Sequence, residues 1–282
     1  MSTWDDLFAL FLATDEGSDK TPPSLPMAEA KRLAASQHLS LREVEIEALR
    51  RQIVPERYRR NLGTVGWEGQ IALLEATVAI VGAGGLGGWI IEGLARMGVG
   101  RLIIIDGDRF EENNLNRQLG CIEATLGQAK AQVLANRVAA LNQATEATAH
   151  VNWLTEENGP DLLRGAQIIV DALDALPIRL ALQRIAAGLD VPMVHGAIGG
   201  HYGQVMTVLP GDRGLFALYG DDGVPEHGVE TELGNPAATP MMIAAWQIQE
   251  VVKLITGQGT PLQKRILMMD ALAGDVTQIE LD

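Results

Sequence analysis

The feature that most constrains the fold is the segment Thr77 to Asp108, in which a glycine-rich turn separates two short hydrophobic runs. Residues 78–81 are apolar and β-branched, residues 82–87 read GAGGLG, and residues 102–105 form a second β-rich run. The apolar residues between the two runs recur at helical spacing. The segment therefore predicts a β-α-β unit of about 30 residues.

The glycine turn of this unit suits a phosphate group. Glycines allow a tight turn and a close approach of the backbone to an anion, and the N–H groups at the start of the following helix attract negative charge. Asp106 follows the second strand, where its carboxylate can accept hydrogen bonds from ribose hydroxyls. We therefore expect Gly82, Gly84, Gly85 and Asp106 to bind a nucleotide. The alternative interpretation is a glycine-rich turn in an ordinary α/β sheet.

Composition and charge limit the partners and the compartment. The chain has 282 residues, of which 47% are hydrophobic, so it is long enough to bury a core. A net charge of −14 argues against general binding to nucleic acids or anionic membranes. The single cysteine, Cys121, excludes an intramolecular disulfide and a cysteine-based zinc cluster. We find neither a signal peptide nor a long apolar span and expect a cytoplasmic protein without membrane contact.

Residues 1–55 are expected to form an N-terminal helical extension with a linker, ahead of the main domain at residues 56–282. A short apolar patch within residues 1–26 suggests a docking helix, which an acidic, proline-containing linker follows. Two helices should come next, and the second of them should begin with a capping box formed by Ser40 and Glu43. Its acidic surface favours packing or partner docking over DNA binding.

The main domain alternates predicted strands and helices, which favours a doubly wound, mostly parallel Rossmann-like sheet in an α/β fold. Residues 201–209 alternate in polarity and suggest an added antiparallel strand, and the last residues suggest a hairpin around Ala273 and Gly274, which together would form a C-terminal antiparallel extension. A helix is expected to begin at a cap formed by Thr125 and Gln128. Residues 210–238 show little periodicity and suggest a lid or a disordered segment.

Charged and amide side chains gather in the sequence around the expected phosphate site. Carboxylates at strand ends suit Mg²⁺, which prefers oxygen ligands together with phosphate oxygens, and cations can neutralise charge at a phosphoryl group under attack. Each residue alone has a structural explanation, and their joint spacing favours the functional one. The set comprises Asp106, Asp108, Asn114, Asn116, Arg117, Gln118, Lys130 and Asp174.

From Arg57 to Leu281 the chain resembles the ubiquitin-activating-type adenylyltransferases, which include the enzymes for the sulfur carriers of molybdopterin and thiamine biosynthesis. The motifs that carry the resemblance are RYRRN, GAGGLG, DGDRFEENNLNRQ, GQAKA, VDALD, VHGAIGGHYGQV and MMDALAGDVTQIEL. The resemblance implies an enzyme that uses ATP and Mg²⁺ to adenylate the C-terminal Gly-Gly carboxylate of a small ubiquitin-fold carrier, with release of pyrophosphate.

The resemblance also implies a role for each matching residue. Gly85 and its surroundings would contact ATP, Asp106 the ribose, and Asn114 and Arg117 the phosphates. Lys130 would stabilise the α-phosphate during attack, and Asp174 would hold Mg²⁺. Arg60 would complete the site of a neighbouring subunit, which implies a homodimer.

The chain departs from the family pattern in its cysteines. The C-x-x-C pairs of zinc-containing members are absent, so we expect no zinc. The loop ETELGNPAATP lacks the transfer cysteine of some members, and we interpret Cys121 as a packed residue. Ala175 replaces an asparagine that often follows the metal-binding aspartate. Alternatives that stay open are adenylation of another carboxylate or amide, such as a modified tRNA base, an NAD-dependent oxidoreductase, and a non-catalytic scaffold.

Overall fold

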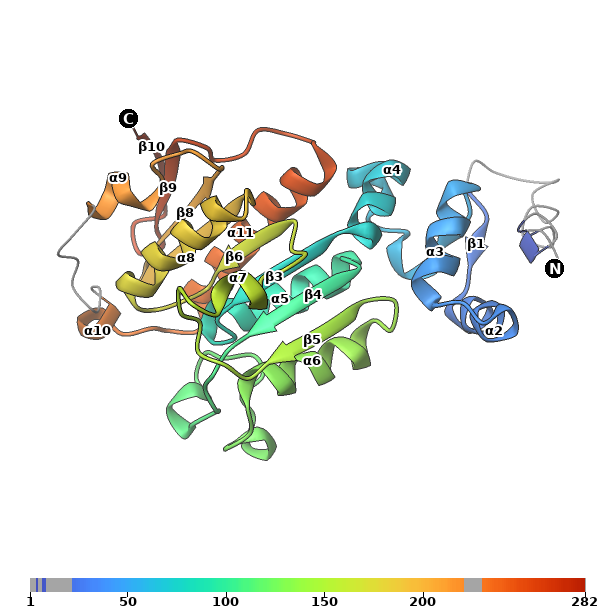
Figure 1. The fold of residues 1–282 in the computed structure, drawn as a ribbon, viewed down its shortest axis with the longest axis horizontal. Helices are drawn as coiled ribbons and strands as arrows, with labels where there is room; N and C mark the ends of the chain where they lie inside the picture. Colours follow the sequence, from blue (N-terminus) through green and yellow to red (C-terminus); the bar gives the residue numbers. More distant parts are fainter. Residues whose placement is uncertain (1–3, 5–6, 9–21, 221–229, 282) are drawn as a thin grey trace.

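The fold, obtained as a computed structural model, is built on one eight-stranded sheet (Figure 1). The structure describes residues 4, 7–8, 22–220 and 230–281. The strand order is β10-β9-β8-β7-β6-β3-β4-β5, in which the five strands from β7 to β5 are parallel and β8, β9 and β10 are antiparallel. The predicted α/β fold, with a mostly parallel Rossmann-like sheet and an antiparallel C-terminal extension, is confirmed.

The strands follow the β-branched and apolar runs of the sequence. Their bounds are β3 Thr77–Val81, β4 Arg101–Ile105, β5 Glu146–His150, β6 Ile168–Asp171, β7 Met193–Gly199, β8 Tyr202–Val208, β9 Arg265–Asp270 and β10 Asp275–Glu280.

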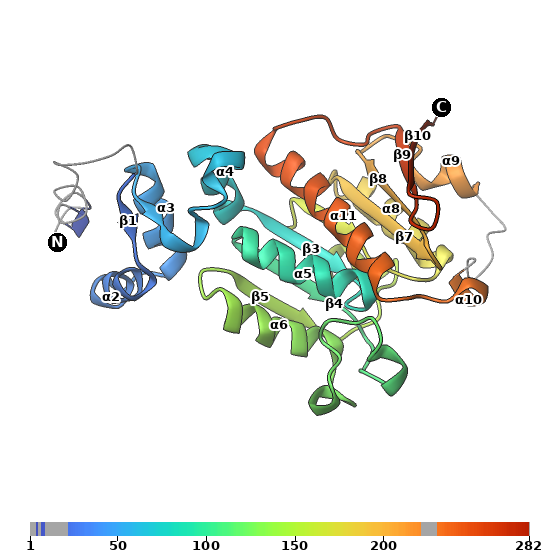
Figure 2. The same cartoon turned by 180° about the vertical axis from the view of Figure 1, so that it is seen from behind.

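Alternate residues of the central strand β3 face two separate apolar cores. Val78 and Ile80 join the core under α5 (Gly85–Met97), α6 (Lys130–Leu141) and α11 (Ala238–Thr256). Ala79 and Val81 join the core on the other face, under α8 (Leu176–Gly188). Figure 2 shows α5, α6 and α11 in front of the sheet, and Figure 1 shows α7 (Gly159–Leu162) and α8 in front of the opposite face. Helices on both faces bury the parallel strands, as the doubly wound arrangement requires.

Several boundaries differ from the sequence prediction. The helix expected at Thr125 begins only at Lys130. Thr125 and Gln128 instead bond to the preceding turn, because the Thr125 hydroxyl accepts from the Ile122 N–H and the Gln128 side chain donates to the Ala124 carbonyl. The segment expected to lack elements holds α9 (Leu215–Tyr219) and α10 (Glu230–Leu233). Its residues 221–229, and most of the docking helix and linker expected within residues 1–26, lie outside the described residues.

The N-terminal elements lie at one end of the molecule, beyond the amino ends of the parallel strands (Figure 1). They are β1 (Ser24–Leu25), α2 (Met27–Gln37), α3 (Leu41–Arg50) and β2 (Val54–Pro55), and α4 (Leu62–Glu75) leads from them into β3. The capping box of Ser40 and Glu43 is confirmed. One apolar cluster joins α2 and α3 to Tyr58, Ile71 and Leu74, so packing is continuous across the expected boundary at residue 55.

A buried polar network fastens α3 to the end of α6. Glu45 is 1% exposed and lies 3.3 Å from Arg57, and Arg57 also donates to Asn142. Asn142 in turn donates to the Tyr58 hydroxyl at 2.9 Å. Burial raises the pKa of the Glu45 carboxyl to about 7, and the Arg57 guanidinium only partly opposes this shift.

Glu45 should make the stability of the protein depend on pH. Its folded pKa of about 7 lies above the ordinary value of 4.5, so the folded state keeps this proton longer than the unfolded state. The free energy of unfolding, taken relative to Glu45→Gln, should fall by up to about 3 kcal/mol as pH rises from about 4.5 through about 7, and should level off above. Urea unfolding of both proteins at several pH values tests this, and a pH-independent difference would contradict it.

Candidate active site

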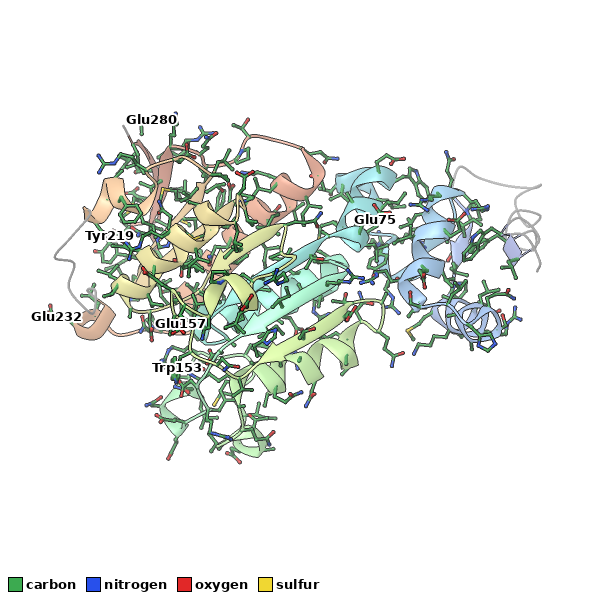
Figure 3. The ribbon with its side chains drawn as sticks, in the orientation of Figure 1. Glu75, Trp153, Glu157, Tyr219, Glu232 and Glu280 are labelled. Carbon is green, nitrogen blue, oxygen red and sulfur yellow. The ribbon has the colours of Figure 1, made fainter. Side chains whose placement is uncertain are left out.

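The candidate site is a cleft at the carboxyl ends of β3, β4, β5 and β6, and it is open to solvent. It lies at the end of the sheet away from the N-terminal elements, the end where Figure 3 labels Trp153. Nine of the predicted site residues line it: Gly82, Gly84, Gly85, Asp106, Asp108, Arg117, Gln118, Lys130 and Asp174.

The glycine turn brings the start of α5 to the floor of the cleft. Gly82 has φ 95°, a left-handed conformation that favours glycine. A Cβ on Gly87 would lie 1.8 Å from the Gly82 carbonyl oxygen, so the turn can close only without a side chain there. Within the described chain no side chain caps the first turn of α5, and its first residues, Gly85 and Leu86, line the cleft at the positive end of the helix dipole.

Asp106 is held by the turn that it faces. Its carboxylate accepts the Ala83 N–H at 2.6 Å and the Asp108 N–H at 2.7 Å. Burial raises the pKa of the Asp106 carboxyl, and the Ala83 N–H opposes that shift. Each carboxylate oxygen keeps a further lone pair for a ligand hydroxyl.

Two cationic side chains, Lys130 and Arg117, line the cleft. Lys130, the first residue of α6, is 6% exposed, and its Nζ lies 2.5 Å from Asp108 Oδ2. Arg117 is half-buried and donates to the Asn113 carbonyl at 2.8 Å and to Asn116 Oδ1 at 2.9 Å. Both side chains are held in fixed positions beside the glycine turn, as electrostatic stabilisation of a phosphoryl group requires.

Three predicted residues do not line the cleft. Asn114 is buried and accepts the Glu111 N–H at 3.0 Å, so it shapes the loop before Arg117. Asn116 donates to the Asn235 carbonyl at 3.1 Å and so ties that loop to the segment before α11. Arg60 is exposed and lies near the C-terminal end of α5, because Tyr58 packs against Gly98. The cleft lies at the opposite end of that helix.

The donor set of the cleft fits a nucleotide and an oxygen-bound cation. Gln118 and Asn235 line the cleft, and their buried side-chain oxygens, Oε1 and Oδ1, have no hydrogen-bond partner within the described chain, which is costly unless a ligand or water satisfies them. Among residues 22–220 and 230–281, no three His, Cys, Asp or Glu side chains cluster as metal ligands. Asp174 would therefore share Mg²⁺ with phosphate oxygens and water, which is how proteins usually hold that ion.

Trp153, Arg179 and Asn235 also line the cleft and were not predicted from the sequence. Trp153 lies in the loop after β5, which ends at His150, and its indole is 69% exposed. The signal that could have revealed it is an aromatic residue beyond a strand end. Arg179 and Asn235 gave no such signal, because Arg179 comes from a helix and Asn235 from the loop ETELGNPAATP, in which the sequence indicated no nucleotide ligand.

The fold and the cleft define a Rossmann-like α/β protein with a phosphate-suited helix start. Residues 58–282 match the ThiF family. The sulfur carrier protein adenylyltransferase of Thermus thermophilus is 35% identical over 226 residues, which cover 77% of this chain and 83% of that protein. The SAMP-activating enzyme E1 of Haloferax volcanii is 33% identical over 222 residues, which cover 77% of this chain and 82% of that protein.

Longer relatives and solved structures extend the comparison. The chain spans about half the length of the maize adenylyltransferase and sulfurtransferase MOCS3-2, with 48% of that protein covered at 34% identity. The crystal structure of PaaA aligns with a TM-score of 0.69 at 21% identity, over 80% of this chain and 82% of that one. The Escherichia coli tRNA N6-threonylcarbamoyladenosine dehydratase, solved with AMP, aligns with a TM-score of 0.61 at 21% identity, over 72% of this chain and 95% of that one.

The chain belongs to the ThiF family. It is an adenylyltransferase of the ubiquitin-activating type, and the membership implies that it uses ATP. In the part of the chain that the structure describes, every helix is too short or too polar to cross a membrane.

Proposed function

We propose that the protein adenylates the C-terminal carboxylate of a small ubiquitin-fold sulfur carrier in the cytoplasm. The observation that carries this proposal is the cleft in which Lys130 and Arg117 lie beside the uncapped start of α5. Relatives that are 33–35% identical and named for sulfur carriers or SAMP activation support the carrier as substrate. The tRNA dehydratase has only 21% sequence identity to this chain, so its similarity concerns the fold alone.

In the proposed reaction, a carrier carboxylate oxygen forms a bond to the α-phosphorus of ATP. The bond from that phosphorus to the bridging oxygen breaks, and pyrophosphate leaves with the electron pair. The carboxylate is already ionised at neutral pH, so no protein base is needed. The N–H groups of α5 and the cations Lys130 and Arg117 would stabilise the charge that develops, and Asp106 would orient the ribose. Mg²⁺ at Asp174 would neutralise charge on the phosphates.

The experiment that tests this function is ATP–pyrophosphate exchange with candidate carriers. A carrier ending in Gly-Gly should support exchange, and the same carrier without its last two residues should not. Carrier-independent exchange, or exchange that only tRNA stimulates, would contradict the carrier proposal. An NAD-dependent oxidoreductase would show no ATP–pyrophosphate exchange with either a carrier or tRNA.

We infer that the exposed indole of Trp153 supports the base of the nucleotide. Its ring packs on Gly107, where an added Cβ would lie 2.8 Å from indole carbons, and Gly107 directly follows the expected ribose ligand Asp106. Asn158 donates to the Trp153 carbonyl at 2.9 Å and fixes the loop. The indole is therefore held beside the cleft while most of its surface stays open.

Trp153→Ala should weaken ATP binding about tenfold, because stacking of a base on an aromatic ring contributes on the order of 1–3 kcal/mol. Trp153→Phe should keep most of the affinity, since it retains a ring. Isothermal titration calorimetry measures both, with tripolyphosphate as the matched ligand that lacks a base. Equal loss of tripolyphosphate and ATP binding would show that Trp153 supports the fold of the cleft instead.

A further inference from the structure

A chain of polar contacts, buried at Asp171 and His195, runs from β6 through β7 and β8 to α9. Asp171, the last residue of β6, and His195 on β7 are both 0% exposed, and Asp171 Oδ2 lies 2.7 Å from His195 Nδ1. His195 Nε2 lies 3.1 Å from Gln204 Nε2, which also donates to the Tyr219 hydroxyl at 2.7 Å. Figure 3 labels Tyr219, at the end of α9.

These contacts define the protonation of His195. An amide nitrogen only donates, so His195 Nε2 must accept from Gln204, and the ring proton must be on Nδ1. Nδ1–H therefore donates to the Asp171 carboxylate. Burial lowers the pKa of His195, which agrees with a neutral ring, although Asp171 opposes the shift.

The other oxygen of Asp171 holds the turn that leads to Asp174. Asp171 Oδ1 accepts the Leu173 N–H at 3.0 Å, and Arg179 Nε donates to the Leu173 carbonyl at 3.0 Å. Both polar backbone groups of Leu173 are thus fixed by buried side chains. Asp174 is the next residue, it is exposed, and it lines the cleft.

We propose that His195 is a positioning residue that holds Asp174 in the geometry needed to share Mg²⁺ with the nucleotide. This inference rests on the proposed function. His195 orients Asp171, Asp171 orients the Leu173 amide, and the Leu173 backbone sets the direction of Asp174. Groups that orient a metal ligand from behind typically contribute 10–100-fold to metal affinity or activity. A histidine that served only the core would affect stability without affecting the response to Mg²⁺.

The test compares His195→Leu, which removes both ring nitrogens, with His195→Asn, whose Nδ2 can still donate to Asp171. Calorimetry measures the affinity for α,β-methylene-ATP without Mg²⁺ and with increasing Mg²⁺. His195→Leu should lose about tenfold or more of the Mg²⁺-dependent gain in affinity, and His195→Asn should lose much less. All variants should bind alike without Mg²⁺. A folded His195→Leu protein with the wild-type Mg²⁺ response would overturn the inference.

A double mutant separates positioning from a general loss of structure. If His195 acts through Asp174, then adding His195→Leu to Asp174→Asn should cost no further Mg²⁺-dependent affinity. Additive losses would overturn the inference. If His195→Leu does not fold, Gln204→Leu is the second variant, because this half-buried residue fixes the His195 tautomer; it should reduce the Mg²⁺ response, and an unchanged response would count against the proposal.

The two proposals fail in different ways. The calorimetry uses no carrier, so an incorrect carrier assignment leaves it unaffected. Wild-type protein that does not bind α,β-methylene-ATP would overturn the proposed function and the inference together. Wild-type binding with an unaffected His195→Leu variant would overturn the inference alone.

Discussion

Lys130→Ala is expected to lower carrier-dependent ATP–pyrophosphate exchange by about 100-fold or more while leaving the fold intact. The loss of one preorganised group that stabilises developing charge typically costs about 3 kcal/mol. Lys130 is 6% exposed and its ammonium is held by Asp108, so in the proposed reaction this charge would already be in a fixed position at the cleft. Initial rates of exchange measure the effect, with circular dichroism and thermal unfolding to confirm the fold.

Arg109→Ala is the matched control for Lys130→Ala. Arg109 belongs to the same loop system and carries the same charge, but it is exposed and donates to the Gly127 carbonyl outside the cleft. Its loss should change exchange less than about threefold, because an exposed charge is screened by water and salt. Equal losses in the two variants would show that the net charge of the loop matters and that Lys130 has no specific role.

The parts of the site that the sequence predicted well are those with short-range causes. The GAGGLG turn requires glycine at Gly82 and Gly87 for local steric reasons, and β-branched runs on either side predict its strands. Asp106 and Asp108 lie within three residues of the end of β4, so the end of that strand predicts their position. Because parallel strands end at the same edge of a sheet, the meeting of Asp106 and Asp174 also followed from the order of elements.

The parts that the sequence did not predict depend on contacts between distant segments. His195 appears as an ordinary polar residue in a strand until the register of β6 and β7 pairs it with Asp171. Two contacts between distant segments set the start of α6: the Asp108 carbonyl accepts the Lys130 N–H at 3.0 Å, and the Phe110 N–H donates to the Gln128 carbonyl. The helix therefore does not begin at the local capping signal of Thr125. Contacts of this kind can be identified only in the folded chain.

Arg60 is the predicted site residue that the fold separates most clearly from its own cleft. It follows Tyr58, which packs against the C-terminal end of α5, and the cleft lies at the N-terminal end of this 13-residue helix. A helix of that length spans about 20 Å, which is farther than an arginine side chain reaches. Arg60 can therefore act at a cleft only in another subunit, and we propose, as the family resemblance implies, that its always-charged guanidinium binds phosphate in the cleft of a second subunit.

Mixing Arg60→Ala with Lys130→Ala subunits should restore about a quarter of wild-type activity, although each variant alone should be nearly inactive. Random exchange makes about half of the dimers mixed, and each mixed dimer has one doubly damaged cleft and one cleft with both residues intact. Exchange rates measured after verified subunit mixing test this.

Arg117→Ala mixed with Lys130→Ala is the matched control for subunit mixing. Both of these residues line the cleft of their own subunit, so no mixed dimer has an intact site and no recovery should occur. Arg59→Ala provides a second comparison, because Arg59 is paired with Glu56 and should remain active. Recovery in the Arg60 mixture alone would establish a site shared between subunits. If that mixture stayed inactive after complete exchange, Arg60 would not complete its neighbour's cleft, and a loss of activity in Arg60→Ala would then have to arise within its own subunit.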